Sequence, residues 1–222
     1  LRHSPVSREI AGVSGFFGGL VGVGLLQLLR LLWPEQSWIN TLSIGLSAFT
    51  LLSGTLGLYY MIRLYLIPAR PYWNHWQTAT AFSGTLLSLG GLLIALVSLV
   101  SDSLSGTLIQ TLAAIIATGL IIEAIGHVFH GHDLKAKGNE GAASHYLQRT
   151  KFGYPWLIRN SLMAINIVAT LIISQTGLNG IGGAITGATL TLSLVTSAVI
   201  GRALFYGIVI PTTLPGGFFW RN

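Results

Sequence analysis

The 222-residue sequence has no cysteine and very few charged residues. The lack of cysteine excludes disulfides, thiolate-ligated iron–sulfur clusters and cysteine nucleophiles from this chain, but leaves its compartment open. Charged residues make up 8% of the chain, against roughly 25% in soluble domains, and 51% of the residues are hydrophobic. Several apolar runs reach the ~20 residues that a bilayer-spanning helix needs. The composition predicts an integral membrane protein in contact with lipids, so the pI of about 10 indicates membrane topology and not nucleic-acid binding.

The chain also lacks an initiator methionine and a signal sequence. Residue 1 is leucine, and the opening LRHSPVSREI is polar and unlike a signal peptide. We therefore expect the sequence to start partway through a longer gene product.

Proline and glycine clusters divide the sequence into six long apolar segments. They predict an all-α fold, a polytopic membrane helix bundle that forms a single integral membrane domain over residues 1–222. The predicted transmembrane helices span residues 7–32, 39–66, 78–100, 107–129, 156–174 and 183–210. The connection at 130–155 is polar and mixed in charge, and is expected to be a loop.

Small residues at a spacing of four mark two faces of the first helix. One face carries Ala11, Gly15 and Gly19, and the other carries Ser14, Gly18 and Gly22. Such spacing lets neighbouring backbones approach closely in lipid, so we expect both faces to pack against other helices.

Basic residues are distributed unevenly between the two ends of the predicted helices. With six spans, eleven of the twelve Lys and Arg residues fall on one side, and only Arg30 falls on the other. Short loops rich in Lys and Arg remain in the cytoplasm. We therefore expect a multi-pass protein of the cell inner (cytoplasmic) membrane, with the basic face and both ends of the sequence in the cytoplasm. A docking surface for an acidic cytoplasmic partner has the same charge bias, so the two explanations overlap.

The segment from Tyr59 to Gln77, YYMIRLYLIPARPYWNHWQ, joins the second and third predicted helices. Aromatic rings prefer the membrane–water boundary, and Arg63 and Arg70 would lie at that boundary beside them. Such a site can hold the head of an amphipathic, redox-active lipid.

Two acidic residues on the basic side can carry protons. Glu123 lies four residues before His127, so both occupy one helix face, and an ionisable pair in a membrane is a functional hypothesis. Quinone reduction takes up two protons, which a Glu–His ladder can supply. The alternative is a structural pair that holds Glu123 against Arg63 or Arg202. Glu9 is the second acid, and it can instead simply cap the first helix.

The histidines do not predict a haem or a metal site. All six fall on the basic side, and only His127 lies within a predicted helix, with no histidine facing it from another helix. His127, His130 and His132 lie near Asp133, but a solvated loop cluster is the favoured interpretation.

These segments together resemble the membrane-anchor subunits of molybdopterin oxidoreductases, the dimethyl sulfoxide reductase anchor family, which is related to the polysulfide and nitrite reductase anchors. The resemblance covers nearly the whole chain and rests on LRHSPVSREI, IRLYLIPARPYWNHWQTATAF and IGRALFYGIVIPTTLPGGFFW. It implies an eight-helix protein, two helices of which precede Leu1, with neither haem nor iron–sulfur cluster. The implied partners are a ferredoxin-like iron–sulfur subunit and a molybdopterin catalytic subunit, and the implied ligand is a quinone (menaquinone, ubiquinone or plastoquinone).

The resemblance also implies site residues. The family's quinone-site acid corresponds to Glu9, whereas Ala198 occupies a position where family members often carry glutamate. Together with the residues singled out above from their spacing and position, the proton-transfer candidates are Glu9, Glu123 and His127. The candidates for binding the quinone head are Arg8, Glu9, Arg63, Arg70, His75, Trp76, Arg202 and Tyr206.

The predicted function is therefore that of a quinone-reactive anchor, the non-molybdenum subunit of an oxidoreductase. Because the basic face is expected in the cytoplasm, the anchors of sulfite-oxidising complexes are the preferred comparison. The alternatives are a quinol-oxidising anchor of a dimethyl sulfoxide or related reductase, a structural tether without quinone, and a secondary transporter. A transporter would favour a repeated half and broken helices, and the first and last three helices show no convincing repeat.

Overall fold

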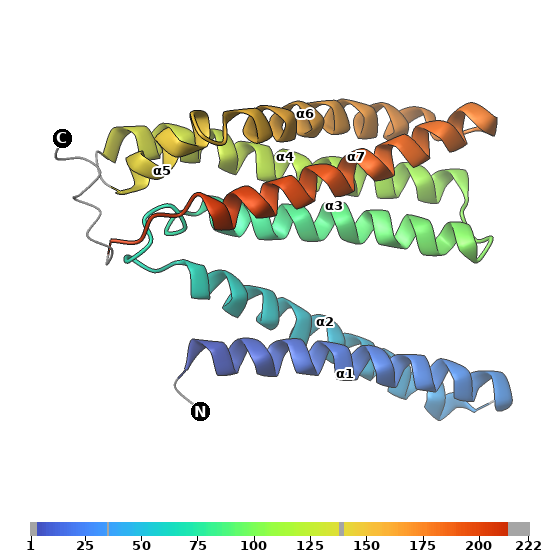
Figure 1. The fold of residues 1–222 in the computed structure, drawn as a ribbon. Coiled ribbons are helices and arrows are strands. Elements are labelled where there is room, and N and C mark those ends of the chain that lie inside the picture. Colours follow the sequence, from blue (N-terminus) through green and yellow to red (C-terminus); the bar gives the residue numbers. More distant parts are fainter. Residues whose placement is uncertain (1–3, 35, 138–139, 213–222) are drawn as a thin grey trace, which may run out of the picture. The chain divides into compact units, whose positions relative to one another are not determined.

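A computed structural model describes residues 4–34, 36–137 and 140–212 of the chain (Figure 1). Within these ranges the protein is helical and has no strand. The helices are α1 (Pro5–Leu32), α2 (Ser37–Tyr65), α3 (Gln77–Val100), α4 (Gly106–Lys137), α5 (Glu140–Arg149), α6 (Gly153–Thr176) and α7 (Gly180–Gly207). All of them except α5 are long and apolar enough to cross a membrane. The predicted all-α fold with six candidate transmembrane helices is confirmed.

The prediction of a loop at residues 130–155 is wrong. Helix α4 continues to Lys137, and α5 follows after two residues. The segment has an amphipathic pattern, which a mixed-charge composition conceals. Leu134 and Ala143 are each 1% exposed and Ser144 is fully buried, while His132 and Lys135 face outward. The polar residues therefore lie on helices that cap the end of the bundle.

The chain divides into two compact units, residues 1–65 and 66–222. The first unit is the antiparallel hairpin of α1 and α2. Glycines form its seam: a Cβ atom added at Gly12 would lie 2.7 Å from the Cα atom of Gly57, and one added at Gly15 would lie 2.9 Å from the Ser53 Oγ atom. The two helices therefore pack with their backbones close together.

The observed seam draws on both predicted small-residue faces of α1: Gly15 and Gly19 come from one face, and Gly22 comes from the other. Gly19 and Gly22 continue the seam and meet Thr50 and Leu46, whereas nothing lies within 4 Å of a Cβ atom added at Gly18. Spacings of three and four alternate along the observed seam, which keeps its residues on one side of a helix with 3.6 residues per turn. A strict spacing of four drifts around the helix and leaves that side.

The second unit comprises α3 to α7. Helix α3 packs on α4, α4 on α6, and α6 on α7. Their apolar core consists of Leu92, Ile116, Leu120, Met163 and Leu194. The loop before α3 and the residues after α7 lie at the same end as α5 (Figure 1). This end carries the described Lys and Arg side chains of the unit: Arg70, Lys135, Arg149, Lys151, Arg159 and Arg202.

Two backbone contacts hold this end of the second unit together. Thr212 donates its N–H to the Ala69 carbonyl (2.9 Å), and Ile210 donates its N–H to Ser144 Oγ (3.2 Å). The Trp73 indole N–H donates to the Phe205 carbonyl (2.8 Å), and their rings stack. The residues after α7 are thereby fixed against both the loop before α3 and α5.

We expect Gly12→Leu to lower the free energy of unfolding by about 1–3 kcal/mol, because its side chain must displace the α2 backbone at Gly57. Detergent-induced unfolding of the purified protein, followed by circular dichroism, measures the change. Gly18→Leu is the matched control, since the space around Gly18 within the hairpin is open. Equal losses in the two variants would contradict the glycine seam.

Candidate functional site

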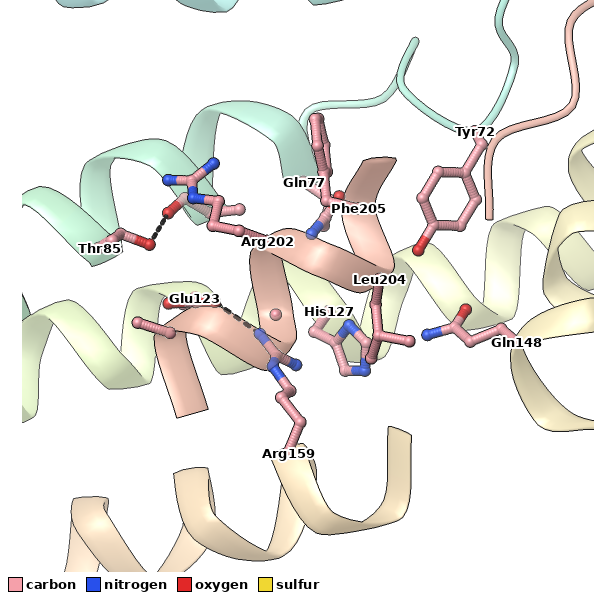
Figure 2. Close-up of a pocket in the computed structure, with 13 residues that line it drawn as sticks. Tyr72, Gln77, Thr85, Glu123, His127, Gln148, Arg159, Arg202, Leu204 and Phe205 are labelled. Carbon is pink, nitrogen blue, oxygen red and sulfur yellow. Dashed lines mark hydrogen bonds and ion pairs between the residues drawn. The ribbon is translucent and has the colours of Figure 1, made fainter. Parts of the chain in front are cut away.

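A polar pocket lies at the basic end of the second unit, among α3, α4, α6 and α7 (Figure 2). Its empty volume is about 460 Å³, mouth included. The lining residues come from five helices and the loop before α3: Tyr72, Gln77, Ala81, Thr85, Glu123, His127, Gln148, Arg159, Ala198, Gly201, Arg202, Leu204 and Phe205.

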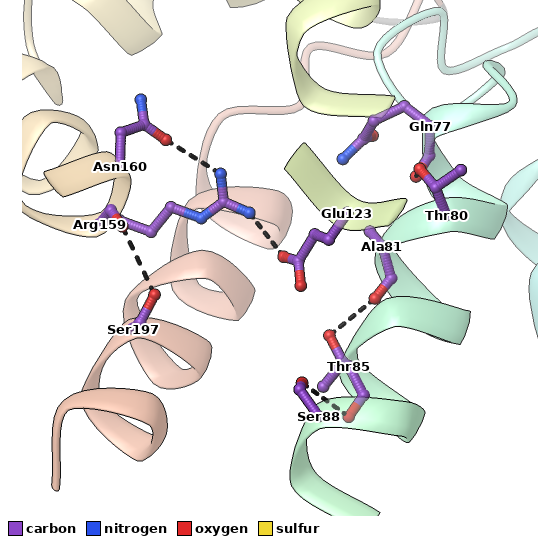
Figure 3. Close-up of polar contacts among 9 residues, drawn as sticks. All are labelled: Gln77, Thr80, Ala81, Thr85, Ser88, Glu123, Arg159, Asn160 and Ser197. Carbon is purple, nitrogen blue, oxygen red and sulfur yellow. Dashed lines mark hydrogen bonds and ion pairs between the residues drawn. The ribbon is translucent and has the colours of Figure 1, made fainter. Parts of the chain in front are cut away.

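A buried ion pair crosses the pocket from α4 to α6 (Figure 3). Arg159 donates from Nη2 to Glu123 Oε1 at 2.5 Å, and from Nη1 to Asn160 Oδ1 at 3.0 Å. The side chains of Arg159 and Glu123 are 5% and 15% exposed. Two charges at such burial are stable only when they are paired and hydrogen-bonded, as these are.

Glycines on the neighbouring helices make room for this pair. A Cβ atom added at Gly84 would lie 2.5 Å from the Gly119 carbonyl oxygen and 2.9 Å from Glu123 Cβ. One added at Gly201 would lie 3.4 Å from Arg159 Nε. The close packing of α3 on α4 at Gly84 therefore positions the Glu123 carboxylate. The absence of a side chain at Gly201 of α7 leaves room for the Arg159 guanidinium.

Further hydrogen-bonding groups surround the pair. Tyr72 is 5% exposed, and its hydroxyl points into the pocket (Figure 2). Burial raises the pKa of Tyr72 to about 12, against the opposing effect of the Arg159 charge, so the phenol stays protonated at neutral pH. The Oε1 atom of Gln77 is buried and has no hydrogen-bond partner among the described residues. Both side chains can therefore bind a polar ligand.

Arg202 contributes a second positive charge. Its guanidinium lies 4.1 Å above the Phe82 ring, a cation–π contact, and it forms no ion pair with any carboxylate in the described ranges. Two arginines and one glutamate line the pocket, so its formal charge is positive before His127 is counted. An anionic or electron-rich ligand suits this balance.

The predicted proximity of Glu123 and His127 is confirmed, since both line the pocket. The proposed structural partner of Glu123 was wrong: it is Arg159, not Arg63 or Arg202. The His127 ring lies 6.3 Å from the Trp156 ring and makes no hydrogen bond to the described part of the chain.

His130 of α4 and His75 of the loop before α3 are buried and packed together, so the interpretation as a solvated loop cluster is wrong for His130, whereas His132 is exposed. His130 is 1% exposed, and its Nε2–H donates to the Tyr72 carbonyl at 2.9 Å. His75 accepts the Gln77 backbone N–H at Nδ1, and its Nε2–H donates to Asp133 Oδ2 at 2.9 Å. The hydrogen bond from His130 to the Tyr72 carbonyl holds the Tyr72 backbone in place beside the pocket. His75 does not line the pocket.

Three further predicted residues lie at the same end but outside the pocket lining. The Arg70 guanidinium lies 4.4 Å above the Trp73 ring, and Tyr206 meets the same ring edge-on at 6.2 Å. Trp76 packs on Phe129 and is 45% exposed.

The remaining predicted residues belong to the first unit. Arg8 and Glu9 lie at the start of α1, and Arg63 lies at the end of α2, so the antiparallel hairpin brings them to one end. The Arg8 guanidinium lies 5.8 Å from the centre of the Tyr60 ring.

Comparisons with known proteins identify the family. A family model described as DMSO reductase anchor subunit (DmsC) matches residues 1–208. The chain belongs to the DMSO reductase anchor subunit family. It is 30% identical over 161 residues to one of the chains of the anaerobic dimethyl sulfoxide reductase of Haemophilus influenzae, an alignment that covers 72% of this chain and 53% of that protein. The sequence thus spans about half the length of that relative. No solved structure matches it.

In this anchor-family chain, sequence analysis missed several pocket residues. The sequence analysis used Arg159 only in the count of basic residues on one side of the membrane. An arginine six residues into an apolar helix, however, indicates a buried partner. Tyr72 and Gln77 stand in the motif that carries the resemblance, but nothing in their spacing shows that they turn inward. Ala198 also lines the pocket.

We expect Arg159→Met to destabilise the protein by about 3–5 kcal/mol, because it leaves the Glu123 carboxylate buried without its partner. The double variant Glu123→Gln/Arg159→Met should lose less, since neither charge is then present. Thermal unfolding in detergent measures both variants. The control is Lys151→Met, which removes an exposed charge at the same end and should change stability by less than about 0.5 kcal/mol. A double variant that loses as much as the sum of the single variants would show that the pair is not coupled.

Proposed function

We propose that this chain is the quinone-reactive anchor subunit of a molybdopterin oxidoreductase, and that it passes electrons between an iron–sulfur subunit and the membrane quinone pool. The observation that carries the proposal is the pocket at the basic end, which is lined by a buried Gln77 oxygen without a described partner, by the Tyr72 hydroxyl and by an arginine that no described carboxylate neutralises. Family membership supports the role in an oxidoreductase complex.

The pocket supplies the groups that a quinone head needs. Quinone carbonyl oxygens accept hydrogen bonds, and Tyr72, Gln77 and Arg202 can each donate one. Negative charge develops on these oxygens as electrons arrive, and a preorganised guanidinium in a low-dielectric site stabilises it. Arg202 is suited to this role because no described carboxylate neutralises it.

Proton transfer accompanies the two-electron reduction of a quinone to a quinol, which consumes two protons. The Glu123 carboxylate is engaged by Arg159, and a proton on it would weaken this charge-assisted hydrogen bond. His127 lines the same pocket without a described hydrogen bond, so we assign the proton transfer to His127 and a positioning role to Glu123. Of the two residues in the predicted Glu123–His127 ladder, only His127 then transfers protons.

Glu9 gives a second candidate position for the quinone head. The family resemblance assigns the quinone-site acid to it, and Arg8 and Arg63 lie at the same end of the hairpin. Each of the two units therefore carries one candidate site. Variants in each unit distinguish the two candidates.

The partners follow from the charge distribution. The ferredoxin-like iron–sulfur subunit would dock on the basic ends of the helices, which the positive-inside bias assigns to the cytoplasmic side of the inner membrane. The molybdopterin subunit would lie beyond it. In this arrangement a cluster approaches the pocket from the aqueous side, while quinone arrives from the lipid.

We expect Arg202→Gln to lower the turnover of quinone by the purified complex by about 10²-fold or more, because it removes a preorganised charge at the reacting oxygen. Glu9→Gln should slow turnover similarly if the head binds in the first unit. Both variants should assemble normally, and quinone extracted from the complex should be quantified beside the kinetics. Lys151→Gln is the control at the same end. If the wild-type complex contains no quinone, the chain is a structural tether.

Two substrate classes are each favoured by one observation. The cytoplasmic assignment of the basic face favours sulfite, whose oxidation to sulfate with water releases two electrons and two protons toward quinone. The similarity to a dimethyl sulfoxide reductase chain favours a quinol-oxidising complex that works in the opposite direction. We propose sulfite oxidation as the first assignment.

Assays of the purified complex in both directions separate these two classes. We expect sulfite to reduce a water-soluble quinone analogue, and we expect dimethyl sulfoxide not to oxidise the reduced analogue. The physical reason is that the molybdenum subunit selects the substrate, and the potentials of the substrate and quinone couples set the direction of electron transfer. The reverse result would assign the chain to a reductase.

A further inference from the structure

A second pocket opens at the basic end, between α4, α5 and α6, with an empty volume of about 1080 Å³, mouth included. We propose that this pocket binds an anionic phospholipid, with the phosphate at its rim and the start of an acyl chain along its floor. The proposal does not rest on the proposed function, although this pocket shares His127 and Gln148 with the first one.

The rim of the pocket is cationic. Lys135 at the end of α4 and Arg149 at the end of α5 line it, together with His132 and His145, and no Asp or Glu is among its lining residues. The nearby carboxylate of Asp133 is engaged by two histidines, His75 and His132. The rim therefore carries positive charge that no described acid in the pocket neutralises.

His145 adds an unsatisfied polar atom to this rim. Its Nδ1 is buried and has no hydrogen-bond partner among the described residues. Burial lowers the pKa of His145, and the charges of Arg149 and Lys135 lower it further. A neutral imidazole between two cations can donate one N–H to an anion, and a phosphate oxygen suits all three groups.

The floor of the pocket is apolar. We call floor the part lined by Ala124, Val128 and Met163, and the Trp156 ring lies 5.4 Å from the Arg149 guanidinium of the rim. Lys135 follows Ala124 by eleven residues along α4, a rise of about 16 Å. The pocket thus passes from hydrocarbon depth to the headgroup level within one lipid's length.

Aromatic residues place the rim at the membrane surface. Tyr146 and Tyr154 are 59% and 76% exposed, and the Arg149 guanidinium lies 5.4 Å from the Trp156 ring. Exposed tyrosine and tryptophan mark the interface, and basic pockets between helices at this level bind anionic headgroups. An acidic protein segment or a free phosphate could pair with the cations of the rim, but neither would cover the apolar floor.

The test uses the protein with its co-purifying subunits, reconstituted in nanodiscs that contain phosphatidylglycerol and phosphatidylethanolamine and then transferred to mild detergent. Native mass spectrometry counts the retained lipids. We expect wild type to retain phosphatidylglycerol selectively, and we expect Arg149→Gln and Lys135→Gln each to lower the retention about fivefold, as the loss of one cation near the surface implies. Lys151→Gln is the matched control: it removes an exposed charge two residues from Arg149, outside the pocket lining.

Three outcomes would overturn the proposal. The first is equal lipid retention in Arg149→Gln, Lys135→Gln and Lys151→Gln. The second is loss of a partner subunit from the Arg149 variant with lipid retention unchanged, which would make the rim a protein-docking surface. The third is displacement of the lipid by millimolar inorganic phosphate, which would leave an ion site without a lipid. Because Lys135 is exposed, its variant should fold normally and keeps the test valid if Arg149→Gln does not.

Discussion

The buried pair of Glu123 and Arg159 is the constraint on which the rest of the second unit depends. Removing two charges from water costs several kcal/mol for each ion, and only close geometry with additional hydrogen bonds offsets that cost. The pair therefore sets the register of α4 against α6. It also requires the small residues Gly84 and Gly201 where neighbouring helices approach these charges.

The unit is layered along its helices as a result. The apolar core around Leu120 and Met163 lies deeper in the membrane, and the polar layer lies toward the basic end. Such a position keeps the charged groups of the polar pocket close to water. The loop before α3 closes this layer, since Tyr72 is held there by His130.

The sequence predicted the parts of the structure that follow from local pattern. Length and hydropathy located six helices with boundaries within three residues, except at the end of α4. Helical periodicity paired Glu123 with His127, because four residues place two side chains on one face. The partner of Glu123 could not be predicted, since the choice among Arg63, Arg159 and Arg202 depends on which helices are neighbours. The α5 cap was missed because its buried face consists of small and polar residues, which resemble a loop in composition.

His127 and Gln148 line both pockets of the second unit, so the two cavities share a wall. Any occupant that shifts α5 or the end of α4 changes the shape of both spaces. By thermodynamic linkage, a molecule in the outer cavity then alters the affinity of the inner one, and the converse holds to the same degree. Under the two proposals above, the lipid composition of the bilayer would then influence how tightly a quinone binds, because His127 and Gln148 line both pockets.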